Sequence, residues 1–142
     1  MKQKIGPLSA EHAAQTEKQR GWVRDHYEED SRHQYDSVEG KVVLLDTILR
    51  SDWIQPQETW KQQGLGVTFG DILVQKLGLD WVTVEDDYGN DPGLQDPETS
   101  ILLFPLTAIS KRIERGESVD VRELIQFFCQ KVEELRNDPN VR

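Results

Sequence analysis

The sequence lacks the features that identify secreted, membrane-embedded and disulfide-linked proteins. It contains one cysteine, so no internal disulfide can form, and this favours a reducing, intracellular compartment. The start of the chain has lysines but no apolar core of the length that a signal peptide requires. No stretch approaches the ~18 apolar residues of a membrane-spanning helix. We therefore expect a cytoplasmic protein that does not associate with a membrane.

Positive charge is also scarce. The chain has 17 Lys and Arg against 26 Asp and Glu, which gives a formal net charge of −9. A surface this acidic repels phosphate backbones, so we expect no nucleic-acid partner. The charge is compatible with a basic protein or a metal cation as partner. It is also explained if its only role is to keep the protein soluble.

The length of 142 residues predicts a single domain over residues 1–142. Eleven aromatic residues, four Trp, four Phe and three Tyr, separate the chain from disordered proteins. We expect residues 1–8 to form a loose N-terminal tail and residues 137–142 a frayed C-terminus.

The first half of the chain has the pattern of helices. Ser9 is a candidate N-cap for a helix over residues 10–30, and a polar connection follows over residues 31–39. Apolar residues at helical spacing predict further helices over residues 40–53 and 57–77. Gly66 and Gly70 lie four residues apart, on one helix face, and would allow another element to approach closely.

The period changes in the second half. Alternating β-branched and aromatic residues predict a strand over residues 80–86, followed by turn signals over residues 87–93. A second, fully apolar strand over residues 101–104 is expected to be central and to pair antiparallel with the first. Pro105 ends it and starts a helix that Gly116 closes, and Asp120 caps the last helix. The expected fold is α+β, with about five helices around a small antiparallel sheet of two or three strands.

An acidic cluster at the end of the first strand is the densest polar group in the sequence. Crowded carboxylates could hold a divalent cation or supply a general acid with a raised pKa. The spacing does not fit a calcium loop, and the sequence favours a solvated turn over a functional site. We retain Glu85, Asp87 and Asp91 as candidate metal ligands, and Asp86, Tyr88 and Arg112 as candidate binding residues.

Other candidates have weaker patterns, and we predict no catalytic residue and no cofactor. The three histidines are spaced by fourteen and seven residues, which is too far apart for one metal ion. Cys129 lies in an apolar helical stripe, which is typical of an inert core thiol. Arg112 could pair with the acids at the strand end and so lock its helix to the sheet.

The middle of the chain, from about Gly64 to Gly116, resembles a bacterial family catalogued as domain of unknown function 3806. Residues 77–92 and 99–117 carry the resemblance, through Trp81, Glu85-Asp86, Tyr88-Gly89, Phe104-Pro105 and Lys111-Arg112. The resemblance implies a bacterial, non-secreted protein and supplies no activity or catalytic residue.

Charge, size and the missing catalytic signatures predict a non-catalytic binding or regulatory protein. One specific form is an acidic, immunity-like partner of a basic protein. The alternative is an enzyme or a divalent-metal-binding domain that uses the acidic residues between 85 and 91. The sequence leaves the oligomeric state open.

Overall fold

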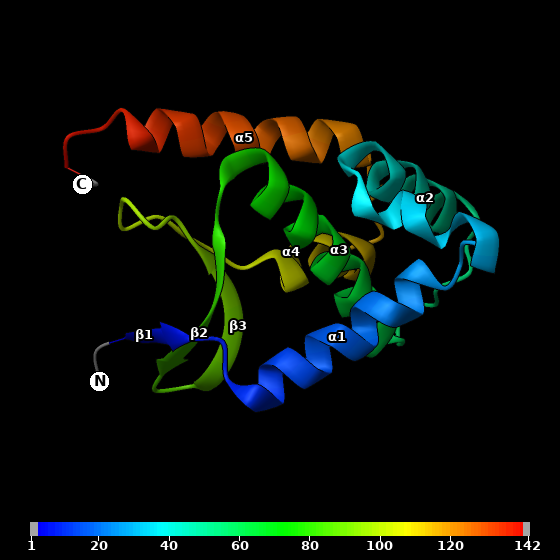
Figure 1. The fold of residues 1–142 in the computed structure, drawn as a ribbon, viewed down its shortest axis with the longest axis horizontal. Helices are drawn as coiled ribbons and strands as arrows, with labels where there is room; N and C mark the ends of the chain where they lie inside the picture. Colours follow the sequence, from blue (N-terminus) through cyan, green and yellow to red (C-terminus); the bar gives the residue numbers. More distant parts are fainter. Residues whose placement is uncertain (1–2, 141–142) are drawn as a thin grey trace.

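A computed structural model describes residues 3–140 and confirms the α+β fold. Most of the helices lie on one side of a four-stranded antiparallel sheet with the strand order β1-β2-β3-β4, and the last helix extends past one end of it (Figure 1). The sheet has one strand more than the upper number we predicted. The elements in chain order are β1 (Lys4–Pro7), α1 (Ala10–Arg24), the 3-10 helix η1 (Glu29–Asp36), α2 (Val38–Arg50), α3 (Thr59–Leu77), β2 (Asp80–Asp86), β3 (Gly89–Gln95), β4 (Leu102–Leu103), α4 (Pro105–Glu114) and α5 (Val121–Arg136).

Helix α3 forms the centre of the hydrophobic core, and its middle is buried on all sides. The predicted close approach at Gly66 and Gly70 is confirmed. A Cβ at Gly66 would lie 2.5 Å from the Cα of Leu106, and a Cβ at Gly70 would lie 2.6 Å from the ring of Trp81. These two glycines therefore let α4 and β2 pack directly against the α3 backbone.

The helix ends follow the sequence signals. The hydroxyl of Ser9 accepts a hydrogen bond from the N–H of His12, and the carboxylate of Asp120 accepts one from the N–H of Glu123. At the end of α3, Gly78 adopts a left-handed conformation with φ of 69°, which a residue with a side chain rarely adopts. Pro105 begins α4 as predicted.

The predicted loose N-terminal tail is wrong for residues 4–7. These residues form β1, whose register pairs Ile5 with Val84 and Pro7 with Val82. The strand had no strong pattern of its own, because four residues that include a glycine and a proline have low strand propensity. Pairing with a regular neighbour, β2, decides the conformation here. Of the predicted frayed C-terminus, residues 141–142 lie outside the described residues, and α5 ends at Arg136.

The predicted turn over residues 87–93 is also wrong, because most of it is β3. Only Asp87 and Tyr88 form the turn, and Gly89 to Gly93 pair with β2. Pro92 is tolerated because β3 pairs only with β2 at this position. Its missing N–H therefore removes no hydrogen bond to a second neighbouring strand. The second predicted strand is accordingly not central. Only two of its residues form a strand, β4, which lies at the sheet edge and pairs with β3 instead of β2.

The end of the first helix and the segment after it differ most from prediction. Helix α1 ends at Arg24, six residues early, and the predicted polar connection contains η1. The ring of Tyr35 explains η1, because this residue is buried against α3 in an otherwise polar segment. One buried aromatic therefore fixes a segment that its composition would leave irregular.

Candidate functional site

The sequence-predicted acids lie at the tip of the β2–β3 hairpin, where they are solvated. Glu85, Asp87 and Asp91 are exposed, and Tyr88 is 96% exposed. A carboxylate oxygen of Asp86 accepts a hydrogen bond from the N–H of Tyr88 at 2.8 Å, which closes the two-residue turn. The hairpin tip thus has the local backbone hydrogen bond that a solvated turn requires.

The geometry of the hairpin separates the candidate metal ligands. Glu85 and Val84 are consecutive strand residues and point to opposite faces. Asp91 lies directly opposite Val84 in the register, so Glu85 and Asp91 project from different faces of the sheet. Within residues 3–140, no three His, Cys, Asp or Glu side chains gather where they could hold a metal ion. The histidines lie apart as well, since His12 contacts Thr83 while His26 stacks on Trp53.

The predicted pairing of Arg112 with the strand-end acids is wrong. Its guanidinium donates to the carbonyl of Ala108, one turn back in α4, at 2.7 Å. It lines a shallow hollow with Asp120 and Glu123, which lie at the start of α5. Arg112 therefore completes its own helix instead of joining α4 to the hairpin.

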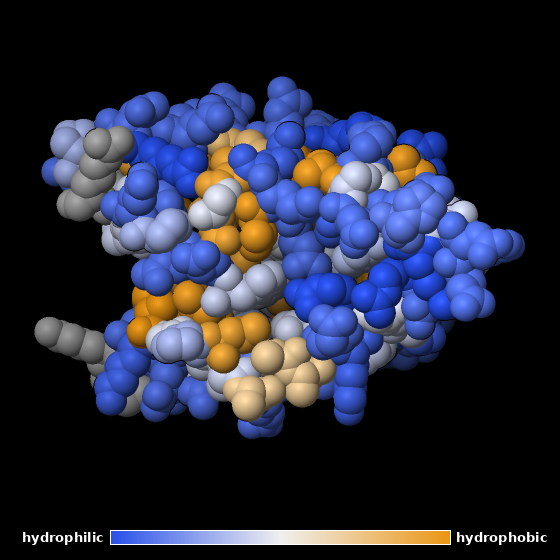
Figure 2. Space-filling view, in the orientation of Figure 1, coloured by the Kyte–Doolittle hydropathy of each residue, from blue (hydrophilic) through white to orange (hydrophobic). Residues whose placement is uncertain are grey.

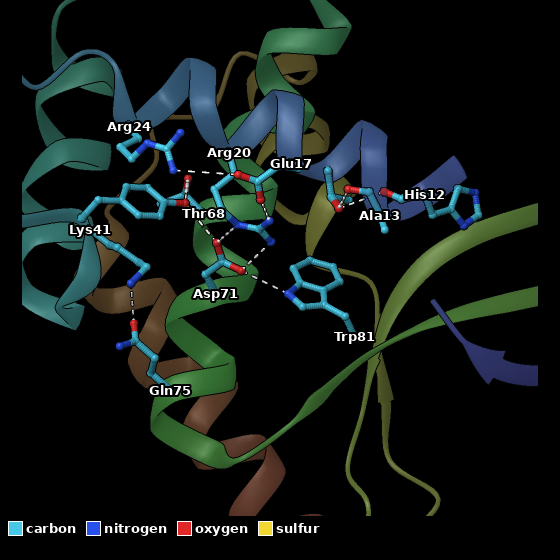
Figure 3. A network of polar contacts seen from close by, with 12 residues as sticks. His12, Ala13, Glu17, Arg20, Arg24, Lys41, Thr68, Asp71, Gln75 and Trp81 are labelled. Atoms are coloured by element: carbon cyan, nitrogen blue, oxygen red, sulfur yellow. Dashed lines mark hydrogen bonds and ion pairs between the residues drawn. The ribbon is translucent and has the colours of Figure 1, made fainter. Parts of the chain in front are cut away.

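The structure instead brings together a polar cluster that the sequence did not reveal, centred on Asp71 (Figure 3). Arg20 of α1 grips its carboxylate with two nitrogens, Nε at 2.7 Å and Nη2 at 3.0 Å. The indole N–H of Trp81 donates to the same carboxylate at 3.1 Å, and the hydroxyl of Tyr35 donates at 3.0 Å. Tyr35 also lies 2.8 Å from the hydroxyl of Thr68. The cluster therefore joins α1, η1, α3 and β2.

The carboxylate of Asp71 is saturated. Oδ1 accepts from Arg20 and Trp81, and Oδ2 accepts from Arg20 and Tyr35. An ionised carboxylate offers about four lone-pair positions, and donors occupy two on each oxygen. The side chain has no position left to take a proton from a substrate or to bind a metal ion. Its chemistry is that of a structural anchor.

The pKa shifts of the residues around Asp71 are consistent with a structural role for the cluster. Burial opposes the charge of Arg20, but the hydrogen bonds and charge of Asp71 outweigh burial and raise the arginine pKa further. Burial, reinforced by the negative charge of Asp71, raises the pKa of Tyr35 far above neutral pH. Tyr35 therefore stays a neutral donor, and Arg20 stays a cation, at every physiological pH.

Lys41 borders this cluster. Its amine has a lowered pKa, which is a property of lysines that act as nucleophiles or bases. Burial lowers the pKa of its amine, although the charges of Asp71 and Asp36 oppose that effect. The amine donates to the side-chain oxygen of Gln75 at 2.5 Å and lies 4.9 Å from the centre of the Tyr35 ring. The residue is only 4% exposed. It lines an open hollow of about 340 Å³, but its amine is held by Gln75.

A second ion pair ties the end of the sheet to α5. Arg136 donates to Asp96 at 2.9 Å and to the carbonyl of Leu77, and Asp96 is 3% exposed. Burial opposes ionisation of Asp96, but the donors Arg136, Thr99 and the Glu98 N–H outweigh it and lower the pKa. This pair holds the segment between β3 and β4 in place.

Cys129 lies in the stripe of α5, as the sequence predicted, but it is half-buried at the edge of the core instead of enclosed in it. It lines a groove of about 530 Å³ between α2 and α5, which an ion pair between Arg122 and Glu39 spans. Burial raises the pKa of its thiol. A thiol with a raised pKa is mostly protonated and is a poor nucleophile at neutral pH.

Sequence reasoning missed the Asp71 cluster, although one signal was present. Asp71 is the only charged residue between Gly64 and Gln75, in a run that is otherwise almost entirely apolar and small. A lone acid in a buried helical run needs partners. Its partners Arg20 and Tyr35 come from segments far away in sequence, and nothing in the sequence marks them.

The fold and the site define a small α+β domain whose internal polar cluster is centred on the saturated carboxylate of Asp71. A family model described as domain of unknown function (DUF3806) matches residues 41–124. The chain belongs to that family, as the sequence resemblance predicted.

A crystal structure of a protein from Bacteroides thetaiotaomicron has a similar fold, with a TM-score of 0.73 at 16% sequence identity. The match covers 89% of this chain and 47% of the other. The chain thus spans about half the length of that protein, and the likeness concerns the fold alone. No curated protein matches this chain.

Proposed function

We propose that this protein is a non-catalytic binding protein whose partner is a basic protein, in the manner of an acidic immunity protein. The saturation of Asp71 carries the proposal. In this polar cluster of the described residues, four hydrogen bonds from neighbouring side chains fill the carboxylate of Asp71. The carboxylate therefore has no acceptor position left for a ligand. Function then falls to the outer surface, which offers charge and exposed side chains to a partner.

The charge of that surface is unevenly distributed along the chain. Between Lys76 and Lys111 the sequence has seven Asp and Glu and no Lys, Arg or His. This segment, which holds β2, β3 and β4, therefore accounts for −7 of the net charge of −9. One of the seven acids, Asp96, is buried and paired with Arg136, so the other six supply the surface charge. An acidic surface of this kind attracts a basic partner and speeds their encounter at low salt.

Affinity capture followed by reconstitution tests the proposal. The immobilised protein is exposed to an extract of its source cells at about 50 mM salt, and the retained protein is then purified separately. We expect a basic partner whose purified form binds at least about tenfold more weakly at 300 mM salt. A partner without excess positive charge, or a complex that is insensitive to salt, would contradict the proposal.

A titration with calcium and magnesium, followed by tryptophan fluorescence, tests the competing metal-binding hypothesis. Trp81 is the reporter, since it lies in β2, the strand that ends in Glu85 and Asp86. The proposal predicts no saturable change at millimolar metal. A saturable change that Asp91→Asn abolishes would favour a metal-binding domain instead.

A further inference from the structure

The two faces of the sheet have different neighbours. Trp81 points toward the helices, because its ring lies against Gly70 of α3. Thr83 points the same way, since its hydroxyl accepts the N–H of Ser9 at 2.8 Å and lies 3.0 Å from His12. Strand residues alternate between faces, so Val82 and Val84 project from the opposite side.

That opposite side, which we call the outer face, carries a separate apolar layer. Register places Ile5 beside Val84, and a Cβ at Gly93 would meet Val84 at 3.3 Å and the ring of Phe104 at 3.4 Å. Val82 and Val84 are buried, yet they do not belong to the hydrophobic cluster that the helices form. The outer face is defined by Ile5, Val82, Val84, Gly93 and Phe104.

Helices α1 to α4 lie on the other side of the sheet, while the C-terminal part of α5 extends past the sheet on the outer side (Figure 1). Ile5 and Phe104 are each 39% exposed. Figure 2 shows hydrophobic residues gathered in a hollow of the surface, between the C-terminal part of α5 and the strands. Ile5 and Phe104 supply the exposed apolar area of this face, beside the buried Val82 and Val84. Apolar side chains grouped in this way are typical of an interaction surface.

Carboxylates border this apolar layer. The strand alternation puts Asp80 and Asp86 on the same side as Val82, and Asp91 lies directly opposite Val84 in β3. Tyr88 extends from the hairpin tip beside them, almost fully exposed. Lys4, the cation of β1, alternates to the other face. The outer face thus combines an apolar centre with a border of negative charge.

We propose that the outer face docks an amphipathic, lysine- and arginine-rich segment of the basic partner. This inference rests on the proposed function. The apolar side of such a segment would cover Ile5 and Phe104, and its cations would meet Asp80 and Asp91. Apolar contact at the centre with charge at the rim is the usual anatomy of protein interfaces.

A labelled model peptide tests the docking site. The probe is a fluorescein-tagged amphipathic helix of about fourteen leucines and lysines, titrated by fluorescence anisotropy at low salt. We expect saturable binding that weakens at least about tenfold in Asp80→Lys/Asp91→Lys and severalfold in Phe104→Ser. Amide chemical-shift changes should concentrate in β1, β2 and β3.

Matched variants separate the outer face from general charge. Glu29→Lys/Asp30→Lys makes the same charge change in η1, and Phe127→Ser removes a phenylalanine that is 58% exposed on α5. Both should bind the peptide within about twofold of the wild type. If Asp80→Lys/Asp91→Lys keeps the melting temperature of the wild type, its loss of peptide affinity is not caused by unfolding.

Three outcomes would overturn the inference: equal weakening in the η1 variant, shift changes centred on another surface, or no saturable binding. The first two leave the proposed basic partner standing, because they show charge-driven binding at another place. Failure of the affinity capture, by contrast, removes the proposed function itself.

Discussion

At the scale of single residues, Asp71 has the clearest assignment, because its four hydrogen bonds fill its capacity. Catalytic residues tend to be held in unfavourable surroundings, so their replacement is often neutral or stabilising. An anchor behaves in the opposite way. The sign of the stability change at Asp71 therefore separates the two roles.

Asp71→Asn should lower the free energy of unfolding by about 2–3 kcal/mol. The variant leaves the charge of Arg20 half-buried and places an amide N–H₂ against existing donors. Asp46→Asn is the control, because its partner Arg50 is largely exposed, and it should cost no more than about 0.5 kcal/mol. Urea unfolding of both variants is the measurement, and equal small losses would contradict the anchor role.

Asp96 gives a prediction about pH. Its pKa is lower in the folded chain than in the unfolded chain, so its ion pair with Arg136 stabilises the fold above the unfolded pKa of about 3.9. That contribution is lost as the pH falls through the folded pKa.

Melting curves of the wild type and Asp96→Asn between pH 7 and pH 2 check this. The wild type should be more stable at neutral pH, and the difference should shrink below about pH 4. A difference that is constant over the whole range would show that the charge of Asp96 is unimportant.

At the scale of elements, the close approach of α4 to α3 depends on Gly66. Gly66→Ala places a methyl group 2.5 Å from the Cα of Leu106, a backbone atom that cannot rotate away. The helices must separate, at a cost of about 1–3 kcal/mol. Gly64→Ala is a matched control in the same helix, because its Cβ would meet ordinary contacts at 3.5 Å. Thermal unfolding should show a loss for the first variant alone, and similar melting temperatures would contradict the packing argument.

The same scale shows how much of the fold could be predicted from the sequence. Strand β2 and the C-terminal helix α5 matched closely, because their apolar periods and caps are local signals. Strands β1 and β3 were missed. Pro7, Pro92 and Gly93 are residues that disfavour strands. The two segments become strands only because their backbones pair with β2. Tertiary pairing overrides weak local propensity in both segments.

Site prediction failed for a related reason. The acidic residues at the hairpin tip were found because they are neighbours in sequence, and the structure leaves them solvated. Asp71 was overlooked because its partners Arg20, Tyr35 and Trp81 come from three other elements. A cluster built from distant segments leaves at most one sign in a single sequence, here an isolated acid in an apolar run.

At the scale of the whole molecule, the chain has two regions with different roles. The helical side holds the core and the satisfied Asp71 cluster. The sheet side carries most of the net negative charge and an outer face on which Ile5 and Phe104 are exposed. The proposed function depends on this division, with the partner held by the sheet and the helices serving as its scaffold.

Hydrogen exchange on the complex with the captured basic partner tests this division most directly. The account predicts slower exchange on binding in Lys4–Pro7, Asp80–Asp86 and Gly89–Gln95, with α2 and α3 unchanged. Protection confined to the hollow around Lys41 and Asp71, with unchanged exchange in the sheet, would contradict it.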